Sequence, residues 1–104
     1  MRVIYTHIDR WASQSSGPSF VTYTAWGLAQ NDVETHLVVW NQSEGHTENI
    51  LRDNFGIHPQ PEKLHIHRLE ARSRGAYLRK AKKLNLELAD RNTALYSSAA
   101  YNLK

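Results

Sequence analysis

The sequence contains no cysteine among its 104 residues. This absence excludes disulfide bonds, thiolate metal ligands and a cysteine nucleophile. Long apolar runs are also lacking, and no segment approaches the roughly 20 apolar residues of a membrane-spanning helix. The polar residues that break up the first part of the chain, and argue against a signal peptide there, are Arg2, His7, Asp9 and Arg10. We therefore expect a cytoplasmic protein.

The composition places the chain among ordinary folded proteins. Apolar residues make up 40% and charged residues 22%, so disorder is not expected. The net charge of +3 is too small by itself to indicate a nucleic-acid partner. The length fits one small domain with a buried core.

Apolar residues and turn signals alternate in a pattern that predicts strands and helices in turn. Leu37–Trp40 is continuously apolar, as in a parallel strand covered on both faces. Tyr77, Ala81 and Leu84 recur at the helical period. The predicted strands are Met1–Ile8, Thr35–Trp40, Lys63–Leu69 and Thr93–Ser97. The first predicted helix starts at Pro18. The second spans Thr47–Phe55, with Thr47 as N-cap and Gly56 as C-cap, and the third spans Gly75–Arg91.

This order predicts an α/β fold, a Rossmann-like three-layer sandwich with a four-stranded, mostly parallel sheet. A doubly wound domain normally continues beyond its fourth strand with a further helix and more strands. We therefore expect residues 1–104 to form a single partial domain whose sheet has an open edge.

The segment between the first strand and the first helix is the candidate ligand site. In open parallel sheets, ligands bind beyond the carboxyl ends of the strands. Gly17 would let a ligand approach the backbone, and Ser15 and Ser16 offer hydroxyl groups. Phosphate or sugar oxygens suit such a helix start. The segment is neither a dinucleotide fingerprint nor a P-loop. It either caps the helix or contacts a ligand.

These segments resemble the N-terminal domain of the group 1 (family 4) glycosyltransferases of the GT-B fold. The resemblance lies in the start Met1–Tyr5, the loop Ser15–Pro18, the helix end Leu28–Ala29, the second strand His36–Val39 and the later segment Ala94–Ser97. It covers nearly all of this chain but only a fraction of a typical member. The family usually has a second glycine in the first loop, where this chain has proline.

The resemblance implies an acceptor-side domain, with Ser16 and Gly17 as substrate-binding residues. The partner domain that grips the nucleotide-sugar would lie further along the chain, so the unit is not expected to transfer a sugar alone. The sugar would pass from the nucleotide-sugar to a sugar or lipid acceptor, and no cofactor is implied. Glu62 and Glu70 share the spacing of the family's catalytic acidic pair, but they flank a predicted strand in the first domain. No catalytic residue is therefore assigned.

Histidines offer two further candidates. His65 and His67 lie on one face of a predicted strand and could share a metal, but no third ligand is evident near them in the sequence. We therefore interpret them as a surface pair and assign no metal site. His7 and Asp9 lie near the ligand edge, where they could take part in chemistry.

Basic residues gather in the third strand and third helix. One interpretation is a solvated helix face, and the other is attraction to an anionic membrane surface, which would suit a peripheral transferase with a lipid acceptor. Nucleic acid is the least favoured partner, because no aromatic strand platform accompanies the charge. The residues concerned are Arg68, Arg72, Arg74, Arg79, Lys80, Lys82 and Lys83.

Two other functions compete with the transferase. The chain could be a stand-alone α/β binding or assembly module without catalysis, in which case the open sheet edge would pair with another copy or another protein. A basic nucleic-acid binder is the third hypothesis.

Overall fold

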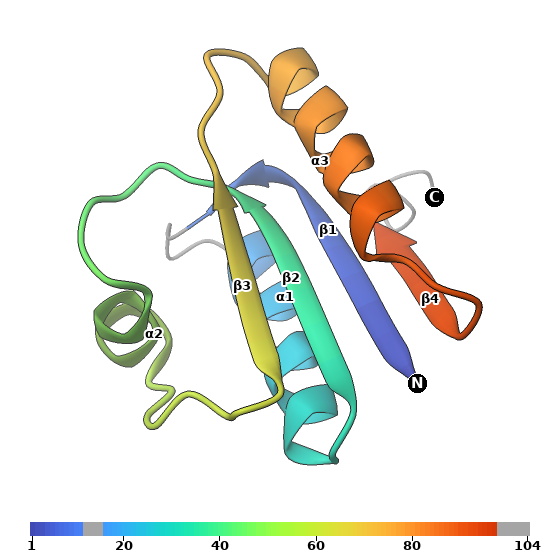
Figure 1. The fold of residues 1–104 in the computed structure, drawn as a ribbon. Coiled ribbons are helices and arrows are strands. Elements are labelled where there is room, and N and C mark those ends of the chain that lie inside the picture. The colour runs from blue at the N-terminus through green and yellow to red at the C-terminus, as the bar shows by residue number, and fades with distance from the viewer. Residues whose placement is uncertain (12–15, 98–104) are drawn as a thin grey trace.

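The computed structural model describes residues 1–11 and 16–97. All four strands are parallel and form one sheet in the order β3-β2-β1-β4 (Figure 1). The strands are β1 (Arg2–Arg10), β2 (Glu34–Trp40), β3 (Leu64–Leu69) and β4 (Thr93–Ser97), and the helices are α1 (Ser16–Gln30), α2 (Thr47–Phe55) and α3 (Arg74–Leu88). The predicted α/β, Rossmann-like class is confirmed, and the sheet is parallel throughout rather than mostly.

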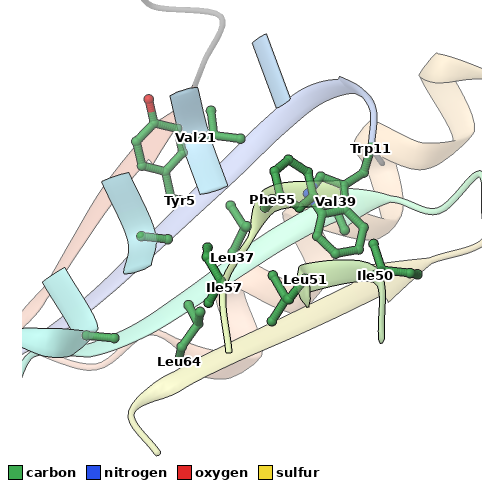
Figure 2. Packing of buried hydrophobic residues seen from close by; sticks show 12 residues of the cluster. Tyr5, Trp11, Val21, Leu37, Val39, Ile50, Leu51, Phe55, Ile57 and Leu64 are labelled. Carbon is green, nitrogen blue, oxygen red and sulfur yellow. The ribbon is translucent and has the colours of Figure 1, made fainter. Parts of the chain in front are cut away.

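Two apolar clusters lie on opposite faces of the sheet. On the first face, α1 and α2 pack over β1, β2 and β3, and Figure 2 shows Trp11, Leu37, Leu51 and Phe55 in this cluster. On the second face, α3 packs on β1 and β2. Every strand residue therefore belongs to the α1 face or the α3 face, and the alternation of side chains along each strand decides which.

Several element boundaries differ from the sequence prediction, and the starts of α1 and α2 matter most. Helix α1 begins at Ser16, so Gly17 lies in its first turn rather than in a loop. Pro18 keeps its favourable place, because the first N–H groups of a helix have no partner within the helix. Thr47 is not the N-cap of α2: His46 occupies that position and its side chain makes no capping bond. Gly56 closes α2 as predicted, with φ of 68°.

The pairing of β1 with β2 is interrupted near the carboxyl ends of both strands. Thr6 pairs with Val38, but the next pair is Arg10 with Trp40, so β1 carries two more residues than β2 across this step. Tyr77 of α3 reaches the interruption, and its buried hydroxyl lies 2.5 Å from the His7 carbonyl oxygen and 3.0 Å from that of Val38. The helix thus supplies the polar contact that the ladder lacks at this point.

Replacing Tyr77 with phenylalanine tests that contact. Both carbonyl groups would lose their buried donor, so we expect Tyr77→Phe to lower the free energy of unfolding by about 1–3 kcal/mol. Chemical denaturation followed by circular dichroism measures the change. Tyr96→Phe is the matched control, because Tyr96 is half exposed, and it should stay within about 0.5 kcal/mol of the wild type. Equal effects of the two substitutions would contradict this role for Tyr77.

Strand β4 is exposed on both of its faces. Leu95 on the α3 face is 57% exposed and Tyr96 on the α1 face is 50% exposed, although both belong to a parallel strand at the end of the sheet. Such strands are normally covered by helices on both faces. Among residues 1–11 and 16–97, no helix is both long and apolar enough to cross a bilayer.

Candidate ligand site at the rim of the sheet

The strand order reverses next to β1. The chain runs from β1 outward to β2 and β3, and β4 then pairs with the other side of β1. In open α/β sheets this switch point, at the carboxyl ends of the strands, is where ligands bind. Strand β1 ends at Arg10 and helix α1 begins at Ser16, on either side of this rim (Figure 1). The candidate site predicted from the sequence therefore lies at the rim that this fold class uses.

Trp11 fixes the start of the connection. Its side chain is 1% exposed and stacks on Phe55 of α2 with ring centroids 5.6 Å apart. Its backbone N–H donates to the Trp40 carbonyl, and its indole N–H donates to the hydroxyl of Thr22 in α1. Thr22 in turn donates to the Pro18 carbonyl at 2.6 Å. Sequence reasoning placed Trp11 in a loop and missed this anchor, which positions the first turn of α1.

His7 lies beneath that first turn. A Cβ atom added to Gly17 would lie 3.5 Å from Cε1 of His7, an ordinary contact distance, so the two residues are neighbours. His7 is only 4% exposed. Burial lowers the pKa of His7 below its usual value, although Asp9 and a backbone contact at Arg10 oppose that shift. The neutral imidazole is therefore the favoured form at the rim.

Charged side chains surround the exposed side of the rim. Asp9 lies 3.4 Å from the Arg74 guanidinium at the start of α3. The Arg10 backbone N–H, and then Arg74, hold the pKa of Asp9 below its usual value. The Arg10 side chain lies over the Trp40 ring, with its guanidinium carbon 5.4 Å from the centroid. Two cations and one carboxylate thus lie at this rim.

A groove between α3 and β4 adjoins the same switch point. Its floor includes Thr6 and Ser97, the last pair in the β1–β4 register, and Leu78 and Lys82 of α3 lie along it. Asn85 also lines the groove and donates to the Thr6 hydroxyl. The Asn85 side-chain oxygen is buried and has no hydrogen-bond partner among the described residues. The groove thus combines hydroxyl and amide side chains with the apolar side chains of Leu78 and Leu95.

The structure also places the other residues that the sequence analysis singled out, in the first loop and on either side of β3. Gly17 is exposed at the start of α1, Ser16 is the first residue of that helix, and Ser15 falls outside the described residues. Glu62 precedes β3 and Glu70 follows it, so the length of the strand separates them. Glu70 accepts a hydrogen bond from Asn41. The two carboxylates do not form an acidic pair.

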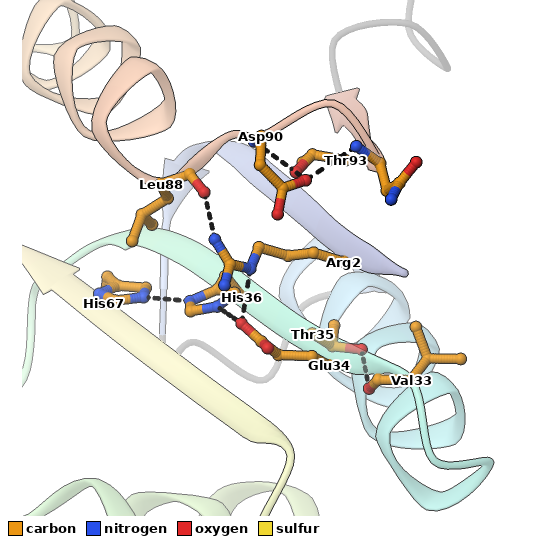
Figure 3. Close-up of polar contacts among 10 residues, drawn as sticks. Arg2, Val33, Glu34, Thr35, His36, His67, Leu88, Asp90 and Thr93 are labelled. Atoms are coloured by element: carbon orange, nitrogen blue, oxygen red, sulfur yellow. Dashed lines mark hydrogen bonds and ion pairs between the residues drawn. The ribbon is translucent and has the colours of Figure 1, made fainter.

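The histidine pair of β3 has neighbours that sequence reasoning missed. His36 of β2 pairs with His65 in the register, and its ring stacks on both His65 and His67 at centroid distances of 4.7 and 5.1 Å. Glu34 lies 2.7 Å from His36 and 2.6 Å from Arg2 (Figure 3). Glu34, His36, His65 and His67 are called the histidine cluster below. The one signal in the sequence was the shared alternation of Glu34-x-His36 and His65-x-His67, which needs the β2–β3 register to be interpreted.

The basic residues do not form one surface. Arg68 turns to the α1 face, where its guanidinium donates to the carbonyls of Ser43 and Gly45. Arg74 pairs with Asp9, and Lys80 donates to the Glu70 carbonyl. The membrane-surface prediction stays a prediction and now depends on four exposed residues: Arg72, Arg79, Lys82 and Lys83.

Comparison with protein-family models, with curated protein sequences and with solved structures finds no match to this chain. The fold and the residues at the rim therefore carry the functional argument.

The buried His7 predicts a pH dependence of stability. The unfolded chain takes up a proton near the usual pKa of 6.5, whereas the folded protein resists it. The unfolded state then binds more protons, so the free energy of unfolding falls as the pH drops below about 6.5 toward the lower folded pKa. Urea titrations from about pH 8 to 5 should show this loss in the wild type and a shallower one in His7→Gln. Identical pH profiles would contradict the assignment.

Proposed function

We propose that this chain is the acceptor-side unit of a GT-B-type glycosyltransferase. It works with a separate nucleotide-sugar-binding domain, and it holds a sugar or lipid acceptor at the rim formed by β1, α1 and the α3–β4 groove. The observation that carries the proposal is the parallel order β3-β2-β1-β4, with the strand reversal beside the β1–α1 connection. The segments that resemble the family form these same elements.

The chemistry of the rim supports a polar, hydroxyl-rich acceptor. Asn85 lines the α3–β4 groove, Arg10 and Arg74 offer donors, and the first turn of α1 offers backbone N–H groups at the exposed Gly17. Sugars are bound by such combinations of directional polar groups around a mostly preformed site.

Amide chemical shifts provide the first test. Glucose, galactose, mannose and N-acetylglucosamine, added in turn to the isotope-labelled chain, should shift the backbone amides of residues 6–10 and of the first turn of α1 other than Pro18, and the Asn85 side-chain amide. Gly17→Ala should weaken this response, because the added methyl group lies between the first turn of α1 and His7 beneath it. Gly27→Ala in the same helix is the matched control, since its added Cβ meets nothing within 4 Å. Shifts confined to other residues, or an equal response in both variants, would overturn the proposal.

The gene provides an independent test. The transcript that contains this chain is expected to encode a second nucleotide-binding domain, and the full product should transfer a labelled sugar from a nucleotide-sugar donor. Asn85→Leu in that product should raise KM for the acceptor and leave KM for the donor unchanged. A transcript without such a domain would count decisively against a transferase.

The bare faces of β4 favour one alternative, a stand-alone module that pairs with a second copy through this strand. Light scattering would then give a dimer, and Leu95→Glu would convert it to a monomer. Leu86→Glu is the control, because Leu86 is 74% exposed on α3 and lies outside the edge strand. A wild-type monomer at all concentrations tested would eliminate this alternative.

A further inference from the structure

The histidine cluster occupies the corner of the sheet that α3 leaves uncovered. Tyr77 and Ala81 of α3 pack on Ile4, Val38 and Trp40, which are α3-face residues of β1 and β2. The same face continues across β2 and β3 toward their amino-terminal ends, and there the side chains are Glu34, His36, His65 and His67. The cluster thus faces away from the rim, and the acceptor proposal does not use it.

The contacts of His36 admit one arrangement of protons when its ring is neutral. Its Nε2 lies 2.7 Å from a Glu34 carboxylate oxygen, which only accepts, so Nε2 carries the proton. Its Nδ1 lies 2.8 Å from Nε2 of His67 and therefore accepts from that atom. The bond between His36 and Glu34 is thus a proton held between an imidazole nitrogen and a carboxylate oxygen. A metal ion can take the place of such a proton.

A third ligand lies beside this pair. Glu34, His36 and His65 each bring one potential ligand atom, and these atoms all lie within 4.8 Å of one another. Ligand atoms around a tetrahedral zinc ion lie about 3.3 Å apart, because each bond to the metal is about 2.0–2.1 Å long. The His65 side chain is exposed, whereas His36 is 7% exposed and is held by its neighbours.

We propose that Glu34, His36 and His65 bind a divalent transition-metal ion, with zinc as the best match. Two imidazole nitrogens and one carboxylate oxygen suit zinc, and softer thiolate ligands are absent from the sequence. Three protein ligands leave one tetrahedral position for water.

His67 acts in this site as a positioning residue. With a metal on Nε2 of His36, the one ring proton of His36 would lie on Nδ1 and that of His67 on its own Nδ1, so that His36 Nδ1–H would donate to Nε2 of His67 and the direction of that hydrogen bond would be reversed. Such a bond fixes the ring of a metal-ligating histidine. Arg2, which donates to Glu34 at 2.6 Å and also to the Leu88 carbonyl, holds the carboxylate from the other side.

Calorimetry of the tag-free, chelator-treated chain tests the site with Zn²⁺ alone. A metal that binds the folded state raises Tm in a concentration-dependent way. We expect this rise in the wild type and its loss in His65→Ala and Glu34→Gln. Both variants should fold, because His65 is exposed and glutamine keeps the shape of Glu34. His46→Ala and His58→Ala remove exposed histidines elsewhere and should keep the full rise.

Titration with Co²⁺ gives a second readout through its visible absorption. His67→Ala should still bind, with affinity lowered by about 10- to 100-fold. An unchanged affinity would contradict the positioning role of His67. A wild type whose Tm does not respond to Zn²⁺, or a rise in Tm of His65→Ala and Glu34→Gln equal to that of the wild type, would overturn the metal site itself.

Discussion

The contact of the Tyr77 hydroxyl with two strand carbonyls is the interaction on which the carboxyl-terminal rim of the sheet depends. Where β1 and β2 lose register, this buried hydroxyl lies within hydrogen-bond distance of the carbonyls of both His7 and Val38. Helix α3 thus adds a polar contact at the step where β1 carries two more residues than β2, as in a bulged strand. Trp11 follows this step, and its indole N–H donates to Thr22 of α1. Contacts from helices on both faces of the sheet therefore meet near the carboxyl end of β1.

Patterns along the chain were enough to predict the elements and the class of fold. The continuous apolar run of β2 and the helical stripe of α3 depend on local spacing, and local spacing is visible in a sequence. Trp11 was missed because its burial depends on Phe55 and Thr22, which lie far along the chain. The histidine cluster was missed because only the pairing of β2 with β3 sets His36 beside His65. Contacts that arise from strand register are invisible until the order of the strands is known.

The two faces of the sheet carry different kinds of side chain. On the α1 face, aliphatic and aromatic side chains are buried beneath two helices. On the α3 face, one helix covers the middle of the sheet, and imidazoles with a carboxylate fill the β2–β3 corner. The rings stack on one another, and the exposed His65 presents a polar surface to solvent at this corner. The same choice of residues brings several potential ligands to one place.

Trp40 contacts both helix α3 and the Arg10 side chain at the rim. Its ring stacks on Tyr77 with centroids 5.8 Å apart, its indole N–H donates to the Ala71 carbonyl, and the Arg10 guanidinium lies against it. The emission of an indole depends on the charges and rings it touches. A molecule that draws Arg10 away from the rim would therefore change the fluorescence of Trp40, so the fold carries its own optical reporter of whether the switch point is occupied.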